Sequence, residues 1–165
     1  MPKSRFAKTT VAKIISMTQT VHTIGTQGMN DEEFIRRLQQ HKVDAVIDIR
    51  LRNEGRFYKF ASGKHINALV EAYGIAYVHE VRFAPTPQML DRFKTDNDWP
   101  AYEQAYHRLM LERDMAGIWQ KVAGQFSRPC LLCAEKSPER CHRRLLAERM
   151  SKEFRVPIVH IEGNV

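Results

Sequence analysis

The chain has 165 residues, of which 43% are hydrophobic and 27% are charged, and its formal net charge is +7 at pH 7. This length suits one domain with a substantial core, and no apolar run approaches the roughly 18 residues of a membrane-spanning helix. No apolar segment of the secretory type follows the basic N-terminal residues, so we expect a cytoplasmic protein without a membrane partner. The positive charge favours polyanionic partners such as nucleotides or nucleic acid.

The N-terminal half predicts two strands, each followed by a helix. VHTIG at 21–25 predicts the first strand, and Asn30 is a favourable N-cap for the helix after it. The apolar, β-branched run AVIDI at 45–49 predicts a strand with both faces buried, as in a parallel sheet. After an irregular loop at 50–63, a second helix is expected to end at Gly74, which suits the left-handed position beyond a helix.

The C-terminal half predicts three further strands. IAYVH at 75–79 predicts the third strand, residues 129–132 the fourth, and VPIVHI at 156–161 the last. Between the third and fourth strands, helical stretches are expected at about 87–94 and 99–113 and then up to Phe126. Ser137 and Pro138 are expected to open the last long helix, as its N-cap and its first helical residue.

This alternation predicts an α/β fold with a largely parallel sheet of about five strands flanked by helices. We expect residues 21–165 to form this single domain and residues 1–20 to form a basic arm before it. Ligands of such sheets bind beyond the carboxyl ends of the strands. The residues expected at or just after those ends are Gly25, Arg50, His79 and Cys133.

All three cysteines lie close together in the sequence, at positions 130, 133 and 141. Cys133 directly follows the predicted fourth strand, and Cys141 is expected within the first turns of the last helix, where unpaired N–H groups and the helix dipole favour an anion. The neighbouring His142 and Arg143 would lower the pKa of a thiol there, and His142 can carry a proton near neutral pH. We therefore predict Cys133 or Cys141 as a nucleophile and Cys130 as a core residue.

The same window offers an alternative, a structural zinc site made by CxxC and the Cys141–His142 pair. Two arguments weigh against it. Cys130 and Cys133 point to opposite faces of a strand, and neighbouring residues on a helix diverge by about 100°. We therefore expect no metal cofactor and keep zinc as the alternative.

The loop after the second strand is the second candidate region. Arg50 and Arg56 flank it, and Asp48 could orient either arginine or act as an acid or base. Aromatic residues accompany the arginines and suggest a clamp for a phosphate and a base: Phe57, Tyr58 and Phe60. The alternative is a solvated loop whose aromatic rings pack on the core.

Several short motifs occur here in a fixed order: Thr23-Ile24-Gly25, Ile47 to Arg50, Arg56, Tyr77-Val78-His79, Ala84-Pro85-Thr86, and Leu131 to Arg143. In this order they resemble the family called domain of unknown function 488. The chain departs from that pattern at Thr26, where a His or Tyr is common, and at Asn53 and Gly55. The resemblance implies an α/β fold and a shared pocket, but no reaction. The pocket residues that it implies are Asp48, Arg50, Arg56, Cys133, Glu135, Lys136, Cys141, His142 and Arg143.

Three functions follow from these observations. In the first, the protein is an enzyme for a phosphate-bearing substrate, a nucleotide or nucleic acid. Its nucleophile or redox thiol would be Cys133 or Cys141, with His142 as proton carrier, and its anion clamp would comprise Arg50, Arg56 and Arg143. In the second, it is a nucleic-acid-binding module whose basic residues only neutralise phosphates. In the third, it is a zinc-binding structural protein.

Overall fold

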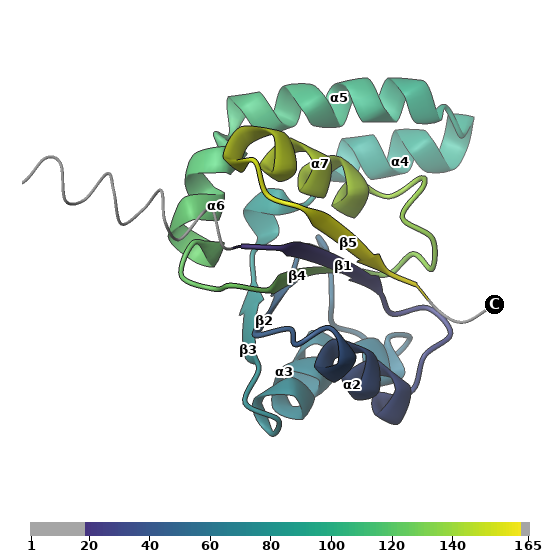
Figure 1. The fold of residues 1–165 in the computed structure, drawn as a ribbon. Coiled ribbons are helices and arrows are strands. Elements are labelled where there is room, and N and C mark those ends of the chain that lie inside the picture. Colours follow the sequence, from purple (N-terminus) through teal and green to yellow (C-terminus); the bar gives the residue numbers. More distant parts are fainter. Residues whose placement is uncertain (1–18, 163–165) are drawn as a thin grey trace, which may run out of the picture.

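The computed structural model describes residues 19–162, so the expected arm at 1–20 lies almost wholly outside the described residues. The described chain forms one sheet of five parallel strands in the order β3-β2-β4-β1-β5 (Figure 1). The strands are β1 (Val21–Gly25), β2 (Ala45–Asp48), β3 (Ala76–His79), β4 (Pro129–Cys133) and β5 (Ile158–Ile161). The predicted parallel sheet is therefore confirmed, and each strand lies within one or two residues of its predicted range.

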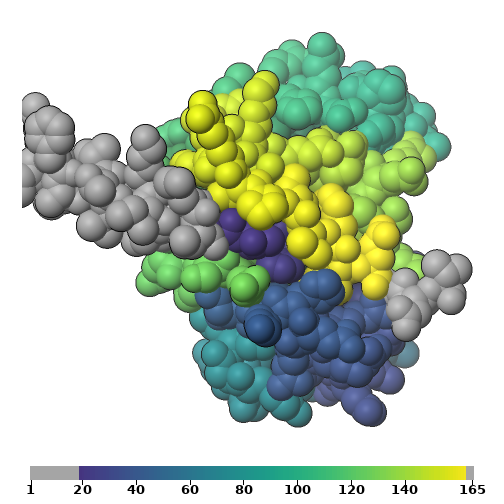
Figure 2. All heavy atoms as spheres, viewed as in Figure 1, coloured from purple at the N-terminus to yellow at the C-terminus, as the bar shows by residue number. Residues whose placement is uncertain are grey.

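Helices cover both faces of the sheet (Figure 1). One face carries α2 (Asp31–Gln40) and α3 (Gly63–Glu71). The other face carries α5 (Trp99–Glu112), α6 (Met115–Ala123) and α7 (His142–Phe154), with α4 (Pro87–Asp96) beside α5. Figure 2 shows the C-terminal segment, α7 and β5 in yellow, between α5 and α2. Two short 3-10 helices, η1 (Lys59–Ala61) and η2 (Val81–Phe83), lie in the loops after β2 and β3.

The core consists of two hydrophobic layers, one on each side of the sheet. Leu131 of β4 packs in the layer under α5, α6 and α7, whereas Cys130 and Leu132 pack in the layer over α2 and α3. This alternation follows from the two-residue period of a strand. Cys130 is fully buried, which confirms its predicted place in the core. Cys133 continues the Leu131 side and therefore points toward α7. Within the described residues, no helix has both the length and the hydrophobicity needed to cross a membrane.

Two helix starts show where local signals succeed and fail. Asn30 is the N-cap of α2 as predicted, and its Oδ1 accepts a hydrogen bond of 2.9 Å from the Glu33 backbone N–H. The last helix does not open at Ser137 and Pro138. It begins at His142, and Cys141 is an N-cap with extended backbone (φ −136°, ψ 137°). Ser137 and Pro138 instead lie in a loop that turns back on itself, where the Cys141 N–H donates to the Pro138 carbonyl.

The strand order creates a crevice at the carboxyl end of β4. The helices after β1 and β2 lie on one face, whereas α7, which follows β4, lies on the other. Because β4 lies between β1 and β2, the chain leaves neighbouring strands in opposite directions there. Such switch points are the usual ligand sites of open parallel sheets. The loops that follow Gly25, Asp48 and Cys133 meet at this edge.

Candidate functional site

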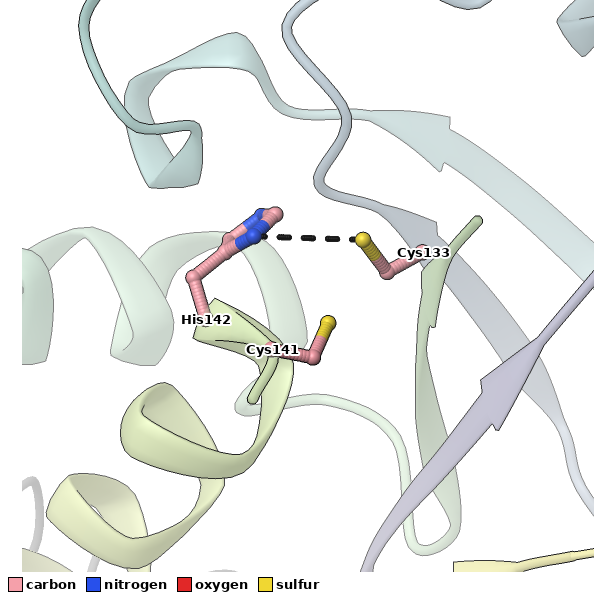
Figure 3. Close-up of side chains that lie close together, drawn as sticks. All are labelled: Cys133, Cys141 and His142. Carbon is pink, nitrogen blue, oxygen red and sulfur yellow. Dashed lines mark hydrogen bonds between the residues drawn. The ribbon is translucent and has the colours of Figure 1, made fainter. Parts of the chain in front are cut away.

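Three predicted site residues meet at the carboxyl end of β4. The Cys133 Sγ lies 3.8 Å from the Nδ1 of His142 (Figure 3). With the Cys141 sulfur, the ligand atoms of the three residues all lie within 4.8 Å of one another. Cys133 comes from the end of β4, whereas Cys141 and His142 come from the start of α7. The fold therefore joins the two ends of the cysteine motif in one cluster.

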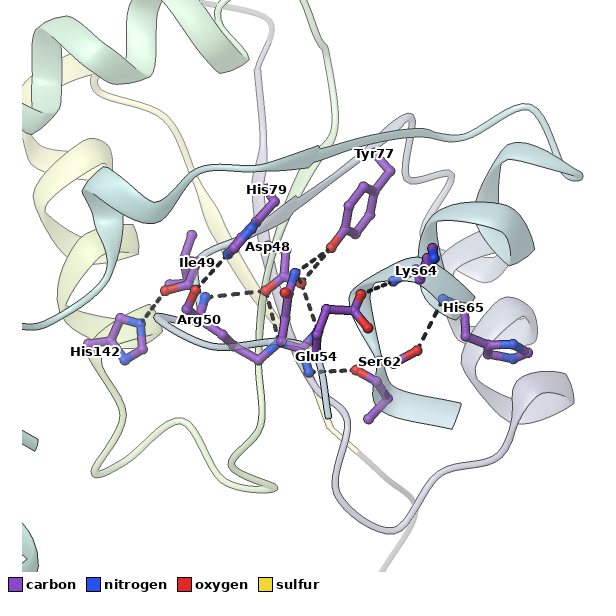
Figure 4. Close-up of polar contacts among 12 residues, drawn as sticks. Asp48, Ile49, Arg50, Glu54, Ser62, Lys64, His65, Tyr77, His79 and His142 are labelled. Atoms are coloured by element: carbon purple, nitrogen blue, oxygen red, sulfur yellow. Dashed lines mark hydrogen bonds and ion pairs between the residues drawn. The ribbon is translucent and has the colours of Figure 1, made fainter. Parts of the chain in front are cut away.

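A backbone carbonyl fixes the tautomer of His142. Its Nε2 lies 3.0 Å from the Ile49 oxygen, which can only accept a hydrogen bond (Figure 4). Nε2 must therefore carry a proton, and the Nδ1 of the neutral ring has its lone pair free toward Cys133. A thiol beside a base that a third group orients is the arrangement of nucleophilic catalysis.

The two thiols of the cluster have opposite tendencies. A hydrogen bond from Cys141 lowers the pKa of Cys133 despite burial, and the charge of Arg143 and the backbone N–H groups of Ala134 and Glu135 lower it further. The pKa of Cys141 is raised well above its ordinary value, because it donates that hydrogen bond to Cys133 and because it is buried. Of the two thiols, Cys133 is therefore the one that ionises more readily.

Arg143 positions the loop between β4 and α7. Its side chain is fully buried, and its guanidinium donates to the Glu135 carbonyl at 2.6 Å and to the Lys136 carbonyl at 3.1 Å. On the other side of the loop, a Cβ on Gly25 would lie 1.8 Å from the Glu135 carbonyl oxygen. The loop therefore depends on a glycine at the end of β1 and on a buried cation. Arg143 acts on Cys133 through charge and loop geometry rather than as an exposed anion clamp.

Asp48 and Arg50 form a buried ion pair beside the cluster (Figure 4). Arg50 Nε and a terminal nitrogen donate to the two carboxylate oxygens at 2.9 and 2.7 Å. Burial alone would raise the pKa of Asp48, but the hydrogen bonds and charge of Arg50, with hydrogen bonds from Tyr77 and Asn53, hold it below its usual value. With its oxygens engaged by these donors, Asp48 is placed to hold Arg50 rather than to exchange protons with a ligand.

The Arg50 side chain is held rigidly at the mouth of the sheet. Its remaining terminal nitrogen donates to the Ala61 carbonyl at 2.7 Å, and the Nε2 of His79 lies 2.8 Å from the Arg50 carbonyl (Figure 4). Each terminal nitrogen of an arginine carries two N–H groups, so Arg50 retains donors for an anion. Arg50 and Cys133 line the same pocket, which confirms that the early arginine meets the late thiol.

A pocket of about 340 Å³ opens beside Cys133. Besides Arg50, three exposed basic residues line it: Arg52, Lys94 and Arg140. Arg140 is held in place by Asn97, whose carbonyl and side-chain oxygens lie 3.0 and 2.9 Å from its terminal nitrogen. Asp91 and Glu135 also line the pocket, so its basic lining exceeds its acidic lining. This pocket can attract an anion to the thiol.

Family comparison agrees with this arrangement. The model of a family described as Domain of unknown function DUF488 matches residues 30–150, which include Asp48, Arg50 and the whole cysteine motif. The chain belongs to the DUF488 family. The resemblance seen in its motifs is therefore confirmed, although the family description gives no reaction. Comparison with curated proteins and with solved structures finds no match.

Three of the pocket residues that the resemblance implied offer no cation to the thiol pocket. The Arg56 side chain is exposed, lies 4.7 Å from the Phe57 ring centre and does not line the thiol pocket. Lys136 is exposed too, and it contributes its carbonyl to Arg143. Glu135 does line the pocket, but its carboxylate would repel a phosphate. The basic residues that line the thiol pocket are instead Arg50, Arg52, Lys94 and Arg140.

The DUF488 cysteine motif also offers a partial metal-ligand set. Cys130 lies on the opposite face of β4, so the four-ligand zinc site is not formed. Our expectation that Cys141 and His142 diverge was wrong, because Cys141 is extended and only His142 is helical. Sulfur and nitrogen ligands of a tetrahedral zinc ion are about 3.6 Å apart, close to the 3.8 Å between Cys133 and His142. Cys133, Cys141 and His142 could therefore hold zinc with its fourth position open. A metal-binding histidine usually donates its other N–H to an acceptor such as a carbonyl, as His142 does to Ile49.

Proposed function

We propose that this protein is a thiol-dependent enzyme that acts on a phosphate-bearing substrate in the cytoplasm. Cys133 is its nucleophile and His142 its proton carrier. The observation that carries the proposal is the geometry at Cys133. Its sulfur faces the Nδ1 of a histidine that the Ile49 carbonyl orients, beside a pocket in which basic residues outnumber acidic ones. A reducing compartment would keep this thiol free.

Displacement at phosphorus is the reaction that this arrangement supports best. The Nδ1 of His142 takes the Cys133 proton, and the thiolate attacks phosphorus. The S–P bond forms as the P–O bond to the leaving alcohol breaks, and His142 gives its proton to the alcohol oxygen. Water then attacks phosphorus, His142 takes a proton from that water, and the S–P bond breaks. Phosphate leaves and His142 returns its proton to the Cys133 sulfur, so the starting thiol is restored and the net reaction is hydrolysis of a phosphoester.

The basic lining stabilises the charge that develops in this reaction. Arg50 and Arg52 contribute donors from the loop after β2, while Lys94 comes from α4 and Arg140 from the loop before α7. The N-terminus of α7 adds the positive end of its dipole next to Cys133. Preorganised donors of this kind are the main source of catalysis in charge-developing reactions.

Protection of the thiol by phosphate tests the proposed substrate class. We expect iodoacetamide to label the wild-type protein rapidly at pH 7 and inorganic phosphate to slow that labelling, because the anion would occupy the basic pocket over Cys133. Arg52→Ala should weaken the protection about 3- to 10-fold, as expected for loss of one hydrogen bond of ordinary strength, whereas Arg36→Ala on the exposed surface of α2 should not. An unchanged labelling rate of the wild-type protein in millimolar phosphate would contradict the proposal.

A metal centre is the second candidate, because Cys133, Cys141 and His142 already lie within 4.8 Å of one another. The two candidates predict different metal contents and different effects of a chelator on the stability of the protein. A metal centre predicts about one zinc ion per purified chain and a loss of stability when a chelator removes it. The thiol enzyme predicts substoichiometric metal, together with unchanged thermal unfolding and labelling in chelator. Metal analysis of the purified protein decides between them. A nucleic-acid-binding module without chemistry would instead show slow thiols and an affinity that falls steeply with salt.

A further inference from the structure

A second hollow adjoins the thiol pocket. It has a volume of about 320 Å³, and it shares Arg50, Tyr58, Ala134 and Glu135 with the first. Its own lining comes from the loop after β1 and the loop after β2: Thr26, Gln27, Phe57 and Ala61. Because four residues border both hollows, one ligand can occupy both, with its two ends in different chemical surroundings.

An exposed aromatic ring marks the second hollow. The Phe57 side chain is 82% exposed, although a ring of this size usually contributes most when buried. Next to it, Tyr58 lies under the Arg50 guanidinium, whose carbon is 5.8 Å from the ring centre. Aromatic rings and arginine planes beside a basic site are the surfaces on which nucleobases stack. Apart from its contact with Arg56, the Phe57 ring is exposed and thus offers a planar ligand a stacking surface, and Tyr58 lines the same hollow.

Polar groups at the edge of this hollow suit the rest of a nucleotide. Thr26 and Gln27 both line this hollow, and the exposed side chain of Gln27 carries an amide that can meet the edge of a base. Glu135 lies at the junction of the two hollows. Its carboxylate is misplaced for a phosphate, but it can accept hydrogen bonds from sugar hydroxyls, as acidic residues do in other nucleotide sites.

We propose that the second hollow is a nucleobase subsite and that the substrate is a nucleoside monophosphate. The base stacks on Phe57 and Tyr58, the sugar passes Glu135, and the phosphate lies among Arg50 and the other basic residues beside Cys133. This inference rests on the proposed function, because it takes the thiol pocket as the phosphate site. The predicted clamp for a phosphate and a base therefore retains its aromatic residues in this proposal. Its Arg56 contacts the Phe57 ring instead of the phosphate.

Protection of Cys133 by three ligands distinguishes the contributions of the base, the sugar and the phosphate to binding. We expect adenosine monophosphate to protect Cys133 from iodoacetamide at a concentration about 5- to 150-fold lower than ribose 5-phosphate, because only the former can stack. Inorganic phosphate should protect least. Phe57→Ala should remove the advantage of adenosine monophosphate and leave protection by ribose 5-phosphate unchanged, whereas Phe57→Trp should keep the advantage. Tyr73→Ala, which removes another exposed aromatic ring, is the matched control and should change nothing.

Each outcome supports or overturns the subsite. Equal protection by adenosine monophosphate and ribose 5-phosphate in the wild-type protein would overturn it and leave the proposed function standing. Equal weakening of both ligands by Phe57→Ala would overturn it too, because the residue would then act on the shared sugar phosphate. If none of the three ligands protects the thiol, the proposed function fails and the subsite fails with it.

Discussion

Cys133→Ser is expected to lower the rate of iodoacetamide labelling at pH 7 by at least about 100-fold, because a serine hydroxyl does not ionise in this range. The other two thiols cannot replace it. Cys130 is fully buried, and burial raises its pKa, while the pKa of Cys141 lies well above the ordinary value. Mass spectrometry of the intact protein and of its peptides measures both the rate and the site of labelling.

Cys141→Ala is the matched variant. It removes the hydrogen bond that contributes most to lowering the pKa of Cys133, so labelling should remain at Cys133 but slow down at pH 7. The reverse pattern, in which labelling survives Cys133→Ser and disappears in Cys141→Ala, would move the nucleophile to the start of α7. The proposed roles of the two thiols would then be exchanged.

Asp48→Asn is expected to lower the free energy of unfolding by about 3–5 kcal/mol, the usual cost of breaking a buried ion pair by removing one partner. The amide is similar in size to the carboxylate, so the loss comes from leaving the buried Arg50 guanidinium without its counter-charge. Urea unfolding at pH 7 measures this difference. Glu153→Gln, which removes one partner of the exposed Arg149–Glu153 pair, is the control and should have little effect.

The pH dependence of the Asp48 effect has a defined sign. The folded protein holds the pKa of Asp48 below its usual value, so the unfolded chain takes up this proton first as the pH falls. The ion pair therefore contributes its full stability above the unfolded pKa of about 3.9 and loses it as the pH falls through the folded pKa. The gap between the wild type and Asp48→Asn should be constant from pH 5 to 8 and narrow below pH 4. A gap of less than about 1 kcal/mol at pH 7 would show that Asp48 does not support Arg50.

The sheet could be predicted from sequence because each strand is a short apolar run followed by a turn or a polar loop. AVIDI and VHTIG are buried on both faces, as their composition indicates. The start of α7 could not be predicted in this way. Ser137 and Pro138 give a strong local signal for a helix start, but the loop is held instead by Arg143 and by the close approach to Gly25. The Gly25 contact joins segments that are distant in sequence, and Arg143 reaches back to Glu135 and Lys136 from beyond the loop, so a rule that considers only the first helical residues misses both.

The thiols and histidine of the site were easier to predict from sequence than the basic residues that line the pocket around them. Cys133, Cys141 and His142 share one motif at the end of a predicted strand, so the parallel topology alone brings them to the ligand edge. Lys94 joins the pocket only because α4 packs over that edge, and nothing in the α4 sequence indicates this. Arg140 could have been found, since it immediately precedes Cys141 within the motif. The tautomer of His142 depends on the Ile49 carbonyl, a backbone contact that no residue type reveals.

The pH dependence of alkylation at Cys133, followed peptide by peptide in the wild-type protein, tests the central claim most directly. A thiolate stabilised by Cys141, Arg143 and the backbone of its loop should be labelled with an inflection clearly below the ordinary cysteine pKa of about 8.5. An inflection at or above that value, or faster labelling of Cys141 than of Cys133, would contradict the assignment of Cys133 as the reactive thiol.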